Sequence, residues 1–469
     1  MYQTKLLRDE HVEPLAEGVY EVLERVGLLC QNQELLQALA KLGAKVDYQT
    51  ERAWFPTKMT REFVDGLRKE YSGRPLADPA FQAPGLPGFG CQIAQIYYDY
   101  RKQERRGGNS RDFIEMIKLA DVLHPNSPAG HCLVPTEFPG RIEALESAML
   151  MAEYAHRPDA AFAWFVEQVD YLKEMGEILG IPNWFHWGAL CFAHPLRFDK
   201  DVADKFVRRA KEGVSAGLTA MPIAGCSTPV TVEGFIVVST AEHVATWLSA
   251  RALNPKVGLG GSMWAGTVDM ATGRVSYSAF DAMYYAFASV EFVRRWIGIE
   301  VVVGGGEYCD AREPGMFAVC EKAYKAMTIA AFTGRHPGIG SGMLECGKVM
   351  APVQLMIERD FSQGAGHFAR KLNPTRDIIG MDPICEVGLC LEQNHLMTEH
   401  TVNHFRTSLW LPQFIERSGW RGAEGDKAML DKAQAQIDDM LSQYRKPEGR
   451  EEKLAKMRAV VERAKQKLL

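Results

Sequence analysis

Eight short apolar runs, most of them followed by an amphipathic helix pattern, fill the middle of this 469-residue chain. A parallel strand covered on both faces reads as a near-continuous hydrophobic run, and a crossover helix follows it. Eight such units predict an α/β fold of the (β/α)8 TIM barrel type, whose chemistry lies at the carboxyl ends of the strands. The last four runs are the clearest: Ser215–Gly225, Lys256–Trp264, Glu300–Tyr308 and Gly338–Leu344.

The same patterns divide the chain into three parts. Residues 1–90 are expected to form a helical N-terminal extension and a connector, residues 91–375 the catalytic barrel, and residues 376–469 a helical C-terminal extension. Within the barrel the helices are predicted at Ser110–Leu123, Arg141–Tyr154, Tyr171–Leu179, Lys200–Glu212, Glu233–Leu253, Ala279–Trp296, Met316–Phe332 and Val349–Arg370.

Composition and charge exclude several classes of protein. Hydrophobic residues make up 46% and charged residues 24%, and the net charge is −5, so nothing favours binding to nucleic acid or to an anionic membrane. No apolar stretch reaches the roughly 18 residues of a membrane helix, and the N-terminus lacks a signal-peptide core. The ten cysteines are irregularly spaced, which favours reduced thiols and a cytoplasmic location.

Aromatic residues gather at the predicted strand ends. Several rings converging on one mouth enclose an apolar cation, and each contact contributes roughly 0.5–2 kcal/mol. Because strands alternate, about half of these rings could instead pack outward against helices. The residues are Tyr97, Tyr98, Trp164, Phe165, His186, Trp187, Trp264 and Tyr308.

Glycines cluster at three of the same strand ends, where they permit a ligand to approach the backbone closely. A phosphate site is one use of such a run, but the glycines before Glu307 are not followed by the usual lysine, serine or threonine. Room for a bulky planar cofactor is the other use. The candidate cofactor-binding glycines are Gly260, Gly261, Gly305, Gly306, Gly340 and Gly342.

Metal and nucleophile patterns are weak. His400 and His404 have zinc-ligand spacing but lack the intervening glutamate, and they lie outside the predicted mouth. Cys309 and Cys346 follow the seventh and eighth strands and leave a thiolate zinc site conceivable. No G-x-S-x-G elbow occurs, which argues against Ser-His-Asp catalysis. We expect the chain to have no metal of its own.

Four segments, taken in order, resemble the trimethylamine methyltransferase superfamily. They are residues 21–47, Ser227–Ala245, Gly340–Gly347 and His400–Pro412, and the resemblance covers nearly the whole chain. It implies a (β/α)8 barrel that hands a methyl group from a methylated amine to the cobalt of a corrinoid (cobalamin) on a separate partner protein.

The founding members of that superfamily carry a pyrrolysine near the end of strand seven, where this chain reads GGGEYCDAREPG with ordinary residues throughout. The resemblance therefore implies the non-pyrrolysine branch. Its members demethylate quaternary amines such as glycine betaine, proline betaine, carnitine or γ-butyrobetaine. Glycine betaine is the first candidate.

A quaternary nitrogen needs no prior activation, because it leaves as a neutral tertiary amine. Its positive charge declines in the transition state, so a cage that bound the cation too tightly would slow transfer. We expect rings and methionines such as Met221 and Met263, with one acid, Glu167 or Glu307, balancing the charge. Glu307 and Tyr308 are the candidate catalytic residues.

A betaine carboxylate would need a donor, and His186, Arg312 and His336 are the candidates near strand ends. The full predicted substrate-binding set is Tyr97, Trp164, Glu167, His186, Trp187, Met221, Trp264, Arg312 and His336. The basic segment Arg101–Arg111 could contact the corrinoid protein, or it could be a solvated loop. Apolar positions in the C-terminal helices suggest a homo-oligomer.

Two other functions remain open. A zinc-dependent methyltransferase for a thiol or an alcohol would use Cys309 and Cys346 as ligands. A betaine-binding barrel without catalytic activity would use the same rings without methyl transfer.

Overall fold

A computed structural model describes residues 5–73, 85–90, 92–334, 338–388 and 393–469. The N-terminal part, which was expected to be helical, contains the helices α1 (Asp9–Arg25), α2 (Gln33–Leu42) and α3 (Thr57–Tyr71). Gly27 ends α1 with a φ of +66°, and a Cβ there would lie 2.2 Å from the Ala53 carbonyl oxygen. Most of the predicted connector lies outside the described residues.

Three short strands between these helices were not predicted. They are β1 (Leu28–Cys30), β2 (Lys45–Asp47) and β3 (Arg52–Trp54), and they form a sheet in the order β2-β3-β1-β8, with β8 (Arg197–Phe198) supplied by the middle of the chain. The N-terminal part therefore shares a sheet with the central part.

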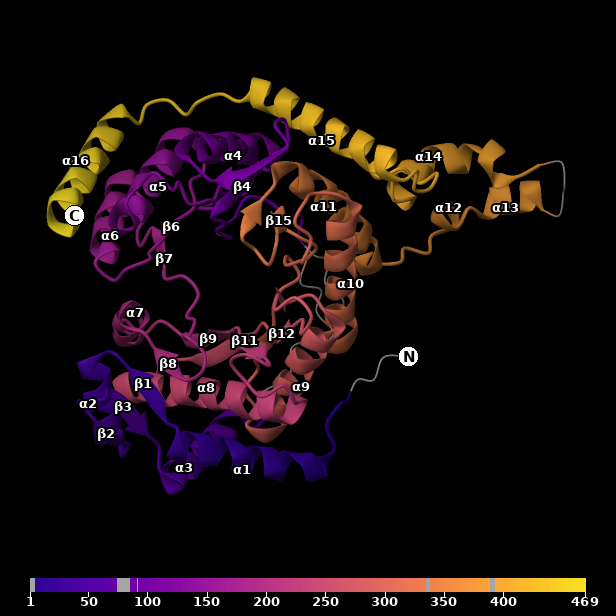
Figure 1. Cartoon of the computed structure of the whole chain (residues 1–469). Coiled ribbons are helices and arrows are strands. Elements are labelled where there is room, and N and C mark those ends of the chain that lie inside the picture. The colour runs from indigo at the N-terminus through magenta and orange to yellow at the C-terminus, as the bar shows by residue number, and fades with distance from the viewer. Residues whose placement is uncertain (1–4, 74–84, 91, 335–337, 389–392) are drawn as a thin grey trace.

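The predicted helices of the middle of the chain are confirmed in position. Figure 1 shows them following one another around a common centre, with short strands on the inner side. They are α4 (Ser110–Leu123), α5 (Gly140–Tyr154), α6 (Gln168–Leu179), α7 (Lys200–Lys211), α8 (Val232–Leu253), α9 (Phe280–Trp296), α10 (Met316–Thr333) and α11 (Pro352–Ala365). Helix α8 is buried along most of its length because it lies between α1 and α2 on one side and β9 on the other.

The predicted closed barrel is wrong. The described residues form small separate sheets of two to four strands, and none of these sheets closes. Parallel pairing joins β14-β11-β9, β6 to β7, and β16 to β4, while β15–β16, β4–β5 and β12–β13 pair antiparallel. The strands are β4 (Ile96–Asp99), β5 (Glu104–Gly107), β6 (Ala161–Phe162), β7 (Phe185–His186), β9 (Ala216–Ala220), β10 (Ile223–Ala224), β11 (Leu259–Met263), β12 (Gly266–Val268), β13 (Val275–Ser276), β14 (Val302–Val303), β15 (Met343–Leu344) and β16 (Val349–Met350).

The backbone of the predicted strands explains the difference. Gly338, Gly340 and Gly342 have φ values of +84°, +73° and +80°, which no extended strand can contain, so the eighth run keeps only two strand residues. The apolar run Asn183–Leu190, the fourth of the eight, is shortened in the same way, because Asn183 and Gly188 have φ values of +53° and +75°. The hydrophobic pattern identified the apolar runs correctly. Left-handed backbone conformations inside these runs interrupt the continuous hydrogen bonding between neighbouring strands that a closed barrel requires.

The described side chains pack into two main cores. One joins the N-terminal helices to α8, β9 and α9, and the other joins α4, α5, α6 and α11 to the C-terminal helices α15 (Ala423–Gln443) and α16 (Glu451–Leu468). The C-terminal part was expected to be helical, and α15 and α16 are helices on the outside of the molecule (Figure 1). No helix among the described residues is long and apolar enough to cross a membrane.

Replacing Gly340 by alanine should lower the free energy of unfolding by about 2 kcal/mol or more. The residue has a left-handed φ, and its new Cβ would lie 1.9 Å from the Oε2 atom of Glu358, which is fully buried. Urea unfolding followed by circular dichroism measures the change. Gly66→Ala, in the middle of α3 with no atom within 4 Å of its added Cβ, is the matched control and should not destabilise. Equal midpoints for both variants would contradict the prediction.

Candidate functional site

Three rings from separate loops meet near the carboxyl ends of β11 and β14. Trp264 follows β11, Tyr277 follows β13 and Tyr308 lies in the loop after β14. The Tyr308 ring centroid is 4.8 Å from that of Trp264 and 6.1 Å from that of Tyr277, both edge to face. A Cβ at Gly304 would lie 2.2 Å from the Trp264 ring, so the glycine lets the indole approach the backbone. We call Trp264, Tyr277 and Tyr308 the aromatic group.

Hydrogen bonds tie the loops of the aromatic group to one another. The Ser278 hydroxyl donates to the Tyr308 carbonyl over 2.9 Å, and the Ser276 hydroxyl donates to the Asp310 carboxylate. The Tyr324 hydroxyl of α10 donates to the Ser278 carbonyl over 2.7 Å. The two tyrosine-bearing loops and α10 therefore hold the rings in fixed relative positions.

Glu307 and Lys325 lie beside the aromatic group. The Gln92 amide donates to Glu307 Oε1 over 3.0 Å, and burial raises the pKa of Glu307 while the charges of Lys325 and Lys322 limit that rise. Lys325 is only 4% exposed, and its ammonium donates to the Tyr277 carbonyl. Burial lowers the pKa of Lys325 to about 8 against the attraction of Glu307. An acid and a lysine thus share one desolvated environment.

A second set of rings follows β6 and β7. The Trp164 ring centroid lies 4.4 Å from that of Phe162, and the Trp187 centroid lies 5.0 Å from that of Phe185. The Trp164 indole donates to the buried Glu143 carboxylate. Trp164 and Trp187, both predicted to bind substrate, therefore pack against Phe162 and Phe185 and not against the rings of the aromatic group.

Lys205 connects the loops that carry the second set of rings. The Lys205 ammonium donates to the Ala163 carbonyl over 2.9 Å, and burial lowers its pKa to about 8. The same ammonium donates to the Trp187 carbonyl over 3.4 Å, so Lys205 joins the loop after β6 to the loop after β7. Burial raises the pKa of the neighbouring Cys191 thiol to about 11.

Several predicted substrate-binding residues have other partners. Tyr97 is buried in the core beneath the Arg106 guanidinium, which lies 5.3 Å from its ring centroid. Glu167, which is exposed at the start of α6, lies 3.8 Å from Arg141. The Met221 amide donates to His194 Nε2 over 3.1 Å.

The predicted carboxylate donors are not grouped. His186 Nε2 lies 3.3 Å from Asp159, and that hydrogen bond raises the pKa of His186. Arg312 is exposed and lies 3.5 Å from Glu345. His336 lies outside the described residues. Lys325, which sequence reasoning missed, is one of two lysines, with Lys322, whose charges lower the pKa of Glu307.

The predicted glycines divide into two kinds. Gly260 faces open space, since no atom lies within 4 Å of a Cβ built there. At Gly261 a Cβ would lie 2.7 Å from His243, and at Gly305 it would lie 2.7 Å from Lys325 Nζ. Gly306 is buried and accepts a hydrogen bond from the Gly340 amide over 3.4 Å, and the Gly342 amide donates to Glu358. Apart from Gly260, these glycines approach other parts of the chain.

The cysteine and histidine pairs do not form a recognisable metal site. Burial raises the pKa of Cys309 to about 11 and that of Cys346 to about 12. The His400 and His404 rings lie 4.4 Å apart, and His400 bonds to the Asp377 carbonyl. In the part of the chain that the structure describes, no three histidine, cysteine, aspartate or glutamate side chains group as metal ligands. No two of the described cysteines form a disulfide.

Comparison with known proteins identifies the class. The model of the trimethylamine methyltransferase (MTTB) family matches residues 1–468, so this chain belongs to that family of methyltransferases. Trimethylamine methyltransferase MttB2 of Methanosarcina mazei is 24% identical over 98% of this chain and 95% of its own length.

Two relatives from Desulfitobacterium hafniense carry different names. Trimethylamine methyltransferase MttB is 22% identical over 97% of this chain and 92% of its own length. Glycine betaine methyltransferase is 21% identical over 97% of this chain and 96% of its own length. The family resemblance is confirmed, and the second relative is consistent with the non-pyrrolysine branch.

Proposed function

We propose that this methyltransferase moves a methyl group from a small quaternary amine, glycine betaine first among them, to the Co(I) of a corrinoid protein. The observation that carries the proposal is the aromatic group beside Glu307, within a loop of ordinary residues from Gly304 to Gly315. Ring faces attract a methylated ammonium without neutralising it. The relative named for glycine betaine supports the same substrate class.

The roles of the residues follow from the charge change in the reaction. The nitrogen begins with a full positive charge and leaves as a neutral amine, so strong ionic contacts would stabilise the bound substrate more than the transition state. Burial raises the pKa of Glu307, which keeps its carboxyl closer to neutral and makes it a weak counter-ion. Trp264 and Tyr308 then position the amine while their loops exclude water.

Lys325 is our candidate for the residue that binds the carboxylate of a betaine. Its ammonium donates to the Tyr277 carbonyl beside the aromatic group, and the charge of Glu307 favours its protonated form. The site would thus offer Glu307 to the ammonium of the zwitterion and Lys325 to its carboxylate. This position replaces the predicted donors His186 and Arg312, which are paired with Asp159 and Glu345.

The proposal is tested with free cob(I)alamin as a surrogate acceptor. Purified protein is mixed anaerobically with trimethylamine or with each of several quaternary amines, and the spectrum is followed for methylcobalamin. We expect methylation with a quaternary amine and none with trimethylamine. Methylation from trimethylamine alone would overturn the substrate class. Tight betaine binding, without methyl transfer to cobalamin or to any corrinoid protein supplied by a methylamine-grown cell, would show a binding protein instead.

Substrate affinity should rise with pH because of Glu307. The pKa of this carboxyl is raised, so it is protonated below that pKa and attracts a cation only when pH passes above it. Lys325, Lys322 and Gln92 are the groups that limit the rise, and Lys325 loses its own charge near pH 8. Titration calorimetry with glycine betaine from about pH 5 to pH 7.5 measures the slope. Glu307→Gln should bind with no slope in that range, and an unchanged slope would contradict the assignment.

A further inference from the structure

A long excursion between α11 and α15 projects from the rest of the molecule. Figure 1 shows α12 (Arg376–Ile379), α13 (Met381–Val387) and α14 (Glu399–Ser408) extending sideways from the ring of helices. At its base the Trp410 indole donates to the Asp360 carbonyl over 3.1 Å. We call residues 366–411, apart from 389–392, the arm.

The arm exposes apolar side chains along its whole described length. Leu372 is 96% exposed, Leu396 81% and Met397 70%, and neither α12 nor α14 has a buried residue. Apart from the 3-10 helix Gly366–Ala369, which contacts α11, the described helices of the arm make their main contacts with one another. The exposed large apolar residues are Phe368, Leu372, Ile378, Ile379, Ile384, Leu396, Met397, Val402, Leu409 and Leu411.

This surface is large enough for a stable interface. Ten apolar side chains that are 44% to 96% exposed, at roughly 100 Å² each, reach the area of about 800 Å² that each partner contributes to a standard interface. Monomeric proteins rarely expose connected apolar patches above a few hundred Å². The arm therefore has the character of a surface that another chain covers.

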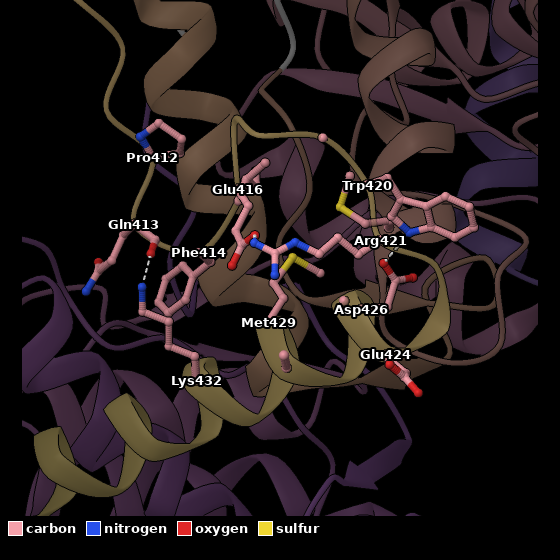
Figure 2. A pocket seen from close by; sticks show the side chains of 15 residues that line it. Pro412, Gln413, Phe414, Glu416, Trp420, Arg421, Glu424, Asp426, Met429 and Lys432 are labelled. Carbon is pink, nitrogen blue, oxygen red and sulfur yellow. Dashed lines mark hydrogen bonds and ion pairs between the residues drawn. The ribbon is translucent and has the colours of Figure 1, made fainter.

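A pocket of about 600 Å³ lies where the arm returns to the body, and we call it the base pocket. Figure 2 shows Phe414 and Met429 on its floor, with charged side chains around its rim. The rim carries three carboxylates, Glu416, Glu424 and Asp426, against two cations, Arg421 and Lys432. Arg421 is already paired with Glu416, which leaves the carboxylates of Glu424 and Asp426 against the single charge of Lys432. The rim therefore keeps a net negative charge.

We propose that two copies of this chain pair by exchanging arms, with Arg370–Leu372 of one copy seated in the base pocket of the other. This segment combines two cations with the most exposed leucine of the described chain, which suits an apolar floor inside an acidic rim. Because arm and pocket adjoin on one face, a two-fold axis lets each copy supply both, and the contact closes as a dimer. The inference does not depend on the proposed reaction.

Sedimentation velocity of the full chain tests the pairing. We expect a dimer for the natural sequence and at least a tenfold higher dissociation constant for Leu372→Glu and for Leu396→Glu. Met270→Glu is the matched control, because Met270 is 82% exposed and lies outside the arm, in the loop between β12 and β13. Circular dichroism checks that each variant is folded.

A charge exchange tests the seating in the base pocket. Lys371→Glu and Glu424→Lys, both at exposed positions, should each weaken the dimer, and the double variant should recover most of the loss. Additive losses in the double variant would overturn this seating. A natural sequence that stays monomeric at about 100 μM, or that associates only with a corrinoid protein, would overturn the exchange of arms altogether.

Discussion

Replacing Lys322 by methionine should lower the free energy of unfolding by about 3–5 kcal/mol, the cost of leaving a buried charge without its partner. Lys322 and Glu358 are both fully buried, and the lysine ammonium donates to the Glu358 carboxylate and to the Met343 carbonyl. Although burial opposes its charge, Glu358 holds the pKa of Lys322 above its ordinary value. The midpoint of urea unfolding measures the loss.

The double variant Lys322→Met with Glu358→Gln separates the stranded charge from the lost packing. Its uncharged amide still accepts the hydrogen bond that the Gly342 amide donates over 2.7 Å. We expect it to be more stable than Lys322→Met alone, since neutral groups of similar size are tolerated where a single buried charge is not. If the double variant were less stable, the large loss would come from packing, and the ion-pair explanation would be wrong.

Replacing Trp264 by alanine should raise the KM for the quaternary amine about 10–30-fold, because one cation–π contact of up to about 2 kcal/mol is lost. The positive charge of the substrate fades in the transition state, so kcat should rise along with KM, and kcat/KM should change much less than KM. Steady-state kinetics with glycine betaine and cob(I)alamin separate the two constants. The loss of the ring also removes the 4.8 Å contact with Tyr308.

Two controls distinguish the ring face from the volume of the side chain. Trp264→Phe keeps an aromatic face and should lose only a few-fold in KM. 3,3-Dimethylbutanoate, which has carbon in place of the betaine nitrogen, should bind the alanine variant about as well as it binds the natural sequence. If alanine weakened both ligands equally, Trp264 would act through packing, and the cation-binding role would fail.

The helices could be predicted from the sequence more accurately than the strands. Helix α4 matches its predicted bounds, and α8, α9 and α10 begin and end within one residue of theirs, because the periodic patterns and caps that define helices are local. The strands depend on backbone conformation at glycines, and hydrophobicity carries no signal for a positive φ at Gly338 or Gly340. The closed barrel was inferred from the number of strand–helix units and from the family resemblance, and neither specifies how the strands pair.

The residues of the candidate site could be predicted from the sequence where they directly follow a predicted strand. Trp264, Glu307 and Tyr308 stand at the ends of clear apolar runs, and the fold brings all three to one place. Tyr277 lies in a short polar hairpin, and Lys325 is one lysine within a long helix, so neither has a local signal. Only the hydrogen bond from Lys325 to the Tyr277 carbonyl reveals that they belong together.

The three rings of the aromatic group come from separate loops that are fastened to one another through backbone carbonyls, such as the bond from Ser278 to Tyr308. Those bonds do not depend on which ring each loop carries. A lineage can therefore exchange one ring by a single substitution while the other two stay in place, and every step leaves a working site. Such a site can pass gradually from one methylated amine to another, and reconstructed ancestors would be expected to accept more than one.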